Sequence, residues 1–188
     1  MEPIVINPTA TSQWQALVNE AEEARAVTLG EDLQSYLVFL LMRFASQPEV
    51  ASSVIAMDFL ESHQAVGQMR QELLRDVGDK CLLFSGLFPE TAKSRLVKVS
   101  YFVSIGQSAY GTLSSIRQES HSELFASLSD DFISLMDVMH AMRDISNAKS
   151  MLPLDAMDLW HESHSEQALK ILRRYVDAVP VVCDPNKH

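Results

Sequence analysis

The amino-acid sequence predicts an all-α fold, and three observations support that prediction. Glycine and proline are scarce, with 6 and 7 among 188 residues, which is typical of long helices joined by short loops. Apolar residues recur at spacings of three and four along most of the chain, as they do on one face of a helix. The chain is 47% hydrophobic, which suits one well-packed domain, and it is short for two. We therefore predict a single domain over residues 1–188, a bundle of six or seven helices.

The apolar pattern and the helix-breaking residues place the predicted helices along the chain. Residues 1–8 are expected to form an extended lead-in, because Pro3 and Pro8 oppose a helix. Residues 180–188, which begin with Pro180, are expected to form a C-terminal tail. Between these ends the predicted helices cover approximately residues 9–27, 31–47, 49–61, 65–88, 99–116, 123–145 and 155–178.

The first three predicted helices are bounded by capping residues and by breakers. Thr9 or Thr11 can accept a hydrogen bond at the start of the first helix, and Gly30 is expected to end that unit. The second helix stops before Pro48 and is apolar on all sides around its middle, which predicts that other helices surround it. The third is a shorter helix rich in apolar residues.

The fourth predicted helix changes character along its length. Polar residues occupy one side of its first half, and Asp79 lies there, away from the apolar stripe. After Lys80 the apolar residues spread beyond the stripe, and Pro89 stops the helix. The start is therefore expected at the surface and the end in the core. Cys81 lies on the apolar stripe and is expected to be a buried, inert thiol.

Residues 97–105 alternate between apolar and polar, so they also fit a β-strand. A strand followed by Gly-x-Ser-x-Gly would form the nucleophile elbow of an α/β-hydrolase. Here Gly106 and Ser108 are followed by Tyr110 in the place of the second glycine, although the strained elbow needs small residues. The chain also offers no other convincing strand for the parallel sheet that carries such a serine.

We therefore predict a helix over residues 99–116 and assign no nucleophilic role to Ser108. Small residues recur at every fourth position along one side of this helix, which allows another helix to approach closely. These residues are Ser100, Ser104, Ser108 and Thr112.

Residues 78–90 read Gly-Asp-Lys-Cys-Leu-Leu-Phe-Ser-Gly-Leu-Phe-Pro-Glu, and Tyr101 and residues 106–110 follow them. This block resembles one shared by a family of uncharacterised bacterial all-helical proteins, a domain of unknown function. The resemblance implies a bacterial origin and no known activity, so it transfers no catalytic residue. It does imply a functional interaction surface around residues 78–110. The candidate contact residues on that surface are Ser104, Ser108 and Tyr110.

Two histidines lie on the apolar stripe of the last predicted helix, where leucines are usual. The stripe consists of Leu154, Met157, His161, His164, Ala168, Ile171 and Tyr175. An inward-facing imidazole needs a partner, and the simplest is a hydrogen-bonding group of the core or of another subunit. Separation by three residues also lets His161 and His164 converge on one ion or ligand, with Asp158 or Glu162 as a further ligand. The sequence predicts no particular cofactor.

Two carboxylate-x-x-histidine pairs, Asp137 with His140 and Asp158 with His161, resemble the ligand pairs of di-iron helical bundles. With 6 histidines and 25 acidic residues, about one such spacing is expected by chance. On a helix that advances about 100° per residue, Asp137 and His140 fall mostly on the polar side of their own stripe. Because the ligands of a bundle-core metal must all project inward, we predict no di-iron centre.

Charge and composition exclude several classes of function. Lysine and arginine number 15 against 25 acidic residues, and the net charge of −10 repels phosphate backbones, so no nucleic-acid partner is expected. Cys81 and Cys183 form neither a disulfide framework nor a zinc-site spacing. The N-terminus lacks the pattern of a signal peptide, and the longest apolar run, residues 36–42, is far short of the ~20 residues that span a bilayer. We expect a cytoplasmic protein.

Three functions remain open at this point. The leading one is a non-enzymatic interaction or regulatory module that binds a partner protein or forms a homodimer, because no convincing catalytic constellation is recognisable. The second is a helical metal- or small-ligand-binding protein, in some cases an enzyme, built around His161 and His164. The third is a carrier of an apolar ligand, which predicts a sizeable internal cavity.

Overall fold

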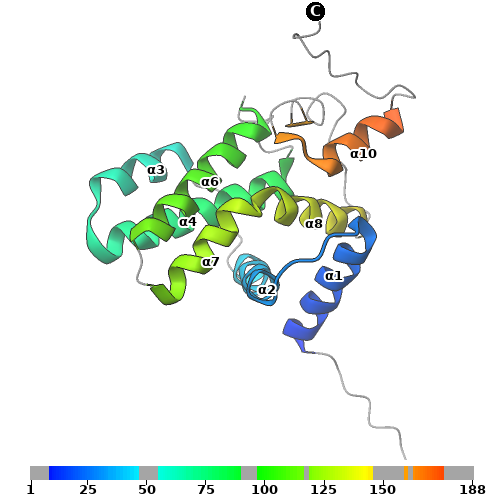
Figure 1. Ribbon diagram of the computed structural model, residues 1–188, viewed down its shortest axis with the longest axis horizontal. Helices are drawn as coiled ribbons and strands as arrows, with labels where there is room; N and C mark the ends of the chain where they lie inside the picture. The colour runs from blue at the N-terminus through cyan, green and yellow to red at the C-terminus, as the bar shows by residue number, and fades with distance from the viewer. Residues whose placement is uncertain are drawn as a thin grey trace, which may run out of the picture.

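The computed structural model describes residues 9–46, 55–89, 97–116, 119–145, 159–160 and 163–175, and within these ranges the chain forms an all-α bundle without a β-strand. The predicted fold class is therefore confirmed. Figure 1 shows the described helices, which are α1 (Ala10–Arg25), α2 (Glu31–Ser46), α3 (Ile55–Gln64), α4 (Gly67–Gly86), α6 (Val99–Ile116), α7 (Glu119–Asp130), α8 (Phe132–Ile145) and α10 (Glu166–Tyr175). None of them is long and apolar enough to cross a membrane. The predicted lead-in and tail lie outside the described residues.

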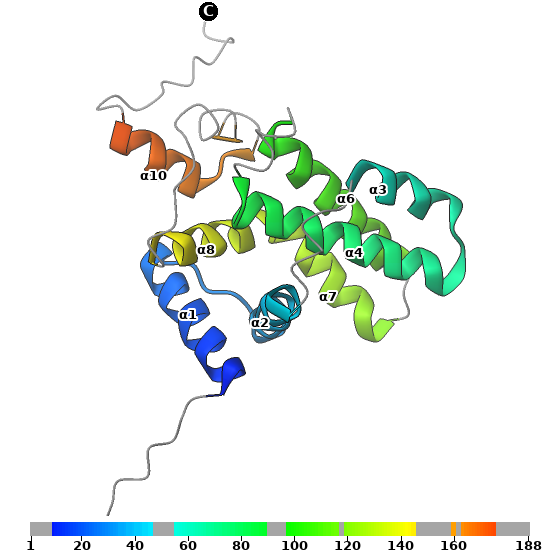
Figure 2. The ribbon, with the colours of Figure 1, turned by 180° about the vertical axis from the view of Figure 1, so that it is seen from behind.

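Helices α4 and α6 form the centre of the bundle and lie along each other. Helix α3 packs beside α4 and α7 beside α6, while α1 packs against both α2 and α8, as Figures 1 and 2 show from opposite sides. The core consists of large side chains from most of these helices, and several are fully buried, including Leu37, Leu74, Phe84, Tyr110 and Phe132. The prediction that residues 99–116 form a helix is confirmed, which removes the nucleophile-elbow alternative.

Glycine allows close packing at two positions, one between α4 and α6 and one between α6 and α8. A Cβ atom on Gly78 would lie 2.4 Å from the ring of Tyr110, and one on Gly106 would lie 2.5 Å from the ring of Phe132. Real Cβ atoms essentially never approach other heavy atoms this closely. Each buried aromatic ring therefore lies directly over a stretch of bare helix backbone. This close packing fixes where Tyr110 meets α4, at the residue next to Asp79.

Helix α4 is exposed at its start and buried at its end, as its sequence pattern predicts. Its first turns are exposed or half-buried, and Leu74 is the first buried residue. Every residue from Cys81 to Gly86 is buried, and Cys81 is a free, inaccessible thiol. Burial raises the pKa of the Cys81 thiol, which keeps it protonated and unreactive. The same helix thus belongs to the surface at one end and to the core at the other.

Helix α1 begins as predicted and ends earlier. Thr9 is its N-cap, and the Thr9 hydroxyl oxygen accepts a hydrogen bond from the Ser12 backbone N–H at 3.3 Å. The helix ends at Arg25, two residues before the predicted end, because Ala26 adopts the left-handed conformation with a φ of 53°. Gly30 lies directly before α2.

Two long predicted helices are broken in the structure. The helix predicted over residues 123–145 is interrupted at Asp131, which separates α7 from α8. Its apolar spacing continues across the interruption through Leu128, Phe132 and Leu135, so the pattern gives no sign of the break. The helix predicted over residues 155–178 is broken at His164, whose φ of 54° is left-handed. Helix α10 begins anew after Ser165.

Candidate functional site

A buried carboxylate joins three helices near the middle of the bundle. Asp79 on α4 is only 5% exposed. The hydroxyl of Tyr36 on α2 and that of Tyr110 on α6 both donate to its Oδ1 atom, at 2.6 and 2.7 Å. The guanidinium of Arg43, about two helical turns beyond Tyr36 on α2, donates to the other oxygen at 3.3 Å. Asp79 thus holds α2, α4 and α6 together through hydrogen bonds that a buried carboxylate requires.

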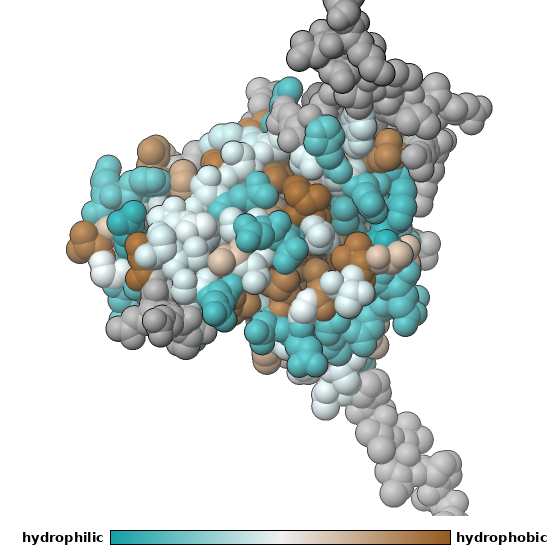
Figure 3. All heavy atoms as spheres, in the orientation of Figure 1, coloured by the Kyte–Doolittle hydropathy of each residue, from teal (hydrophilic) through white to brown (hydrophobic). Residues whose placement is uncertain are grey.

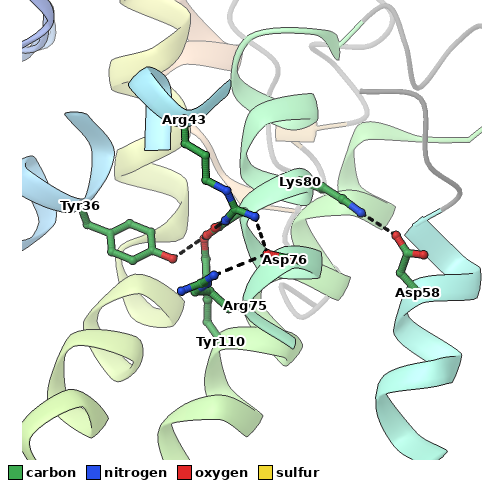
Figure 4. Close-up of polar contacts among 8 residues, drawn as sticks. Tyr36, Arg43, Asp58, Arg75, Asp76, Lys80 and Tyr110 are labelled. Carbon is green, nitrogen blue, oxygen red and sulfur yellow. Dashed lines mark hydrogen bonds and ion pairs between the residues drawn. The ribbon is translucent and has the colours of Figure 1, made fainter. Parts of the chain in front are cut away.

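A second carboxylate extends this network to the surface. Arg43 makes a shorter ion pair with Asp76, at 2.9 Å, than it makes with Asp79. Arg75 approaches the same oxygen of Asp76 only to 3.9 Å, and both arginine side chains are 39% exposed. Figure 4 shows the two guanidinium groups converging on Asp76 from α2 and α4. We call Tyr36, Arg43, Arg75, Asp76, Asp79 and Tyr110 the Asp79 cluster.

Burial controls the titration of this cluster. It raises the pKa of Asp79, and the hydroxyls of Tyr36 and Tyr110 and the charge of Arg43 lower that pKa only in part. Burial, together with the negative charge of Asp79, raises the pKa of Tyr36 and of Tyr110 well above the usual value. Both phenols therefore stay protonated at neutral pH and remain hydrogen-bond donors to the carboxylate.

An open pocket lies beside the cluster, between α2 and α4. Its volume is about 200 Å³, and its lining consists of Tyr36, Phe39, Leu40, Arg43, Arg75 and Asp79. We call this space the α2–α4 pocket. Phe39 is 64% exposed, so the prediction that other helices surround the apolar middle of α2 is wrong at this side. Residues on the opposite side of α2, such as Leu37 and Leu41, are buried as predicted.

A second buried polar group lies on α8. Asp137 accepts a hydrogen bond of 2.5 Å from the Ser165 hydroxyl and another from the Gln167 backbone N–H, at the start of α10. Burial raises the pKa of Asp137 to about 6. His140 donates its Nε2 proton to the Ser85 carbonyl oxygen at 2.8 Å, and burial lowers the pKa of His140 to about 4. No described residue hydrogen-bonds to its Nδ1 atom.

The prediction that Asp137 and His140 fall on a polar side of their helix is therefore wrong. Helix α8 packs against α1 on one side and against α4 and α10 on others, so almost its whole circumference is covered. A single apolar stripe cannot reveal that a helix is surrounded. Within the part of the chain that the structure describes, no group of three or more potential ligand residues is arranged to hold a metal ion.

The candidate histidines predicted from the sequence do not form one inward face. The side chain of His164 is exposed and stacks edge-on against Trp160, with ring centroids 5.6 Å apart. Its left-handed backbone ends the preceding turn, so the prediction of an inward-facing His164 is wrong. His161, Asp158 and Glu162 lie outside the described residues, and their role in ligand or metal binding stays a prediction.

The candidate contact residues on α6 divide between surface and core. Ser104 and Ser108 are exposed. Tyr110 is fully buried and bonded to Asp79, so it cannot contribute to an interaction surface, and its inclusion there is wrong. A helix rotates by about 200° over two residues, so Tyr110 lies on the core side of α6 whereas Ser108 lies on the solvent side.

An unexpected set of apolar side chains is exposed on the hairpin of α3 and α4. Met57, Leu60, Val66 and Met69 are 60%, 61%, 82% and 60% exposed. We call these four residues the hairpin surface. Figure 3 shows apolar atoms exposed at the end of the molecule where α3 and the start of α4 lie. This surface could not be predicted from the sequence, because apolar residues at helical spacing are normally interpreted as core.

The sequence did carry a partial signal for the Asp79 cluster. Gly78, Asp79 and Tyr110 all lie within residues 78–110, where a functional surface is expected from the sequence, and the structure brings the three together. Tyr36 and Arg43 carried no signal, since they come from a helix far away in sequence. In comparisons of the chain with protein-family models, with curated proteins and with solved structures, nothing matches.

Proposed function

We propose that this chain is a non-enzymatic interaction module that binds a partner protein through the hairpin surface. The observation that carries the proposal is the exposure of Met57, Leu60, Val66 and Met69 on one helical hairpin. Single exposed apolar residues are ordinary, but several large ones exposed on one helical hairpin favour a protein-binding role. Two of the four are methionines, whose unbranched side chains adapt to differently shaped partners.

The exposed side chains are not needed to hold the hairpin together. Helix α3 packs on α4 through its other side, where Ile55 and Ser62 are buried. The ammonium of Lys80 also forms an ion pair with Asp58 at 2.7 Å, which ties α3 to the middle of α4. Because the hairpin is held by these contacts, the exposed apolar residues are free to contact another molecule.

Site-specific photo-crosslinking in cells that produce the protein tests this proposal. A photoreactive amino acid in place of Leu60 should give a covalent adduct, whose mass identifies the partner, and an adduct of two copies indicates a homodimer. The same residue in place of Asp130, which is exposed on α7, is the control. Equal adduct yields at the two positions would contradict the proposal.

A second measurement separates binding from folding. With the photoreactive residue in place of Met57, the further change Leu60→Ser should abolish the adduct. The melting temperature should stay within about 1 °C, because substitutions of exposed residues change stability little. Gln68→Ser, at an exposed polar position of the same hairpin, is the matched control and should leave the adduct unchanged. An adduct that persists in Leu60→Ser would contradict a role for this surface.

A further inference from the structure

We propose that the α2–α4 pocket binds a small organic anion, a carboxylate or phosphate ester joined to an apolar or aromatic group. The proposal is independent of the hairpin surface, because the pocket lies between α2 and the middle of α4. It depends on the charge, the hydrogen-bonding capacity and the apolar lining of that pocket.

The volume of the pocket limits the size of its ligand. At about 200 Å³ the pocket lies below the range of roughly 300–1,000 Å³ that is typical of drug-sized sites. A ligand of one ring or a short chain with a single anionic group is the size that fits. A folded domain or a nucleic acid could place no more than one of its groups there.

Arg75 has hydrogen-bond donors to offer in this pocket. Its Nη2 atom lies 3.9 Å from Asp76, which is beyond hydrogen-bonding distance, and the side chain is 39% exposed, so a ligand can reach its terminal nitrogens. The Nε atom is buried and has no partner among the described residues. Arg43, by contrast, already donates to Asp76 and to Asp79. A planar guanidinium with open donors matches a carboxylate or phosphate, with which it forms paired, charge-assisted hydrogen bonds.

The carboxylate in the pocket does not favour a cation instead. Oδ1 of Asp79 accepts from two tyrosine hydroxyls and Oδ2 accepts from Arg43, so both oxygens are occupied. A cationic ligand would have to displace Arg43 from Asp79 and would lie beside Arg75. An anion meets neither obstacle, since it adds acceptors where Arg75 has unused donors.

The apolar part of the ligand has its own contacts. Phe39 presents an aromatic ring that is 64% exposed at this pocket, and Leu40 and the ring of Tyr36 line it as well. An aromatic or aliphatic group placed against Phe39 would remove that exposed ring from water. The combination of a guanidinium with an exposed aromatic ring therefore favours an aromatic acid or an aryl phosphate over an inorganic ion.

Titration of the full-length protein followed by two-dimensional NMR tests the proposal with four probes. Benzoate and phenyl phosphate are the anions, and benzamide and benzylamine are matched neutral and cationic controls of similar size. We expect saturable shifts of the α2 and α4 amide resonances with an anion only. Saturation by benzoate alone identifies a carboxylate site, and saturation by phenyl phosphate alone identifies a phosphate site. Equal binding of benzamide or benzylamine, or no saturable shift with either anion, would overturn the proposal.

A pair of arginine variants locates the site. Arg75→Gln should weaken anion binding about tenfold or more, because it removes a charge-assisted pair and keeps the fold. Arg70→Gln is the control, since Arg70 is a half-buried arginine of the same helix whose Nε atom is also unpartnered, and it does not line the pocket. Phe39→Ala should weaken the binding of both anions as well. Anion binding that is unchanged in Arg75→Gln, or weakened equally in Arg70→Gln, would place the anion elsewhere.

Discussion

Tyr110 illustrates how much of this structure depends on individual polar atoms. Its ring fills the space that the absent side chain of Gly78 leaves open. Its hydroxyl donates a hydrogen bond to Oδ1 of Asp79, the same atom to which the Tyr36 hydroxyl donates. A buried tyrosine needs such a partner, and a buried carboxylate needs several. The cluster therefore specifies the mutual positions of three helices as well as stabilising them.

Removal of the Tyr110 hydroxyl should measure how much the hydrogen bond from Tyr110 to Asp79 contributes to the free energy of unfolding. We expect Tyr110→Phe to lower the free energy of unfolding by about 1.5–3 kcal/mol, as for other hydrogen bonds to a charged group. For a chain of this length the melting temperature should fall by about 2–4 °C for each kcal/mol. Tyr101→Phe is the control, because Tyr101 is 40% exposed on the same helix and should change little. Equal effects of the two changes would show that the bond to Asp79 contributes nothing.

The buried acid and base on α8 should give opposite pH dependences. His140 has a pKa of about 4 in the folded state against 6.5 in the unfolded state, so the unfolded state takes up its proton first. Its contribution to stability is complete above pH 6.5 and is lost as the pH falls towards 4, roughly 3 kcal/mol in total. Asp137 has a pKa of about 6 against 3.8, so stability instead falls as the pH rises through that interval.

Urea unfolding between pH 4 and 7 should separate these two contributions. In Asp137→Asn the loss of stability towards acid should become steeper than in the unchanged protein, because His140 then titrates without the opposing contribution of Asp137. In His140→Gln the loss towards acid should disappear or reverse. Curves with the same pH slope for both variants and for the parent protein would show that neither group is perturbed by burial.

At the scale of helices, the close packing of α4 on α6 depends on the absence of a side chain at Gly78. Gly78→Ala should increase the intrinsic helix propensity of α4 by up to about 1 kcal/mol, yet the new methyl group would collide with the Tyr110 ring. Overpacking of this kind costs about 1–3 kcal/mol, so we expect a net loss of stability and a weaker bond from Tyr110 to Asp79. Gly30→Ala is the control, because no atom lies within 4 Å of its added Cβ. A stabilised Gly78→Ala variant would contradict the close crossing.

Helix periodicity predicted which segments are helical far better than where each helix ends. The start of α1 at Thr9 followed from a capping side chain, which is a local signal. The break at His164 had no such signal, since no glycine or proline marks it and the apolar stripe continues past it. Ser165 explains the new start, because its hydroxyl oxygen accepts from the Ala168 N–H at 3.4 Å and its proton bonds Asp137 on α8. That bond depends on tertiary structure, which the sequence pattern does not show.

At the scale of the whole molecule, the fold class could be predicted and the candidate sites could not. The apolar spacing and the scarcity of glycine and proline are local properties of the sequence, and they suffice to predict an all-α bundle. The Asp79 cluster draws its members from α2, α4 and α6, so its existence depends on how these helices cross. The hairpin surface depends on which apolar residues remain uncovered after packing, and that is known only once every helix is in place.

Helix α4 is exposed at its start and buried at its end, and this difference predicts which part of the helix opens locally. Amide hydrogens exchange with solvent when the surrounding structure opens, and a helix end with few buried contacts opens at little cost in free energy. Amides of residues 67–73 should therefore exchange deuterium much faster than those from Cys81 to Gly86, which should open only with global unfolding. Helix α3, which packs mainly on α4, should exchange with the fast group. The end of the molecule that carries the hairpin surface would then be able to reshape itself around a partner while the Asp79 cluster stays closed.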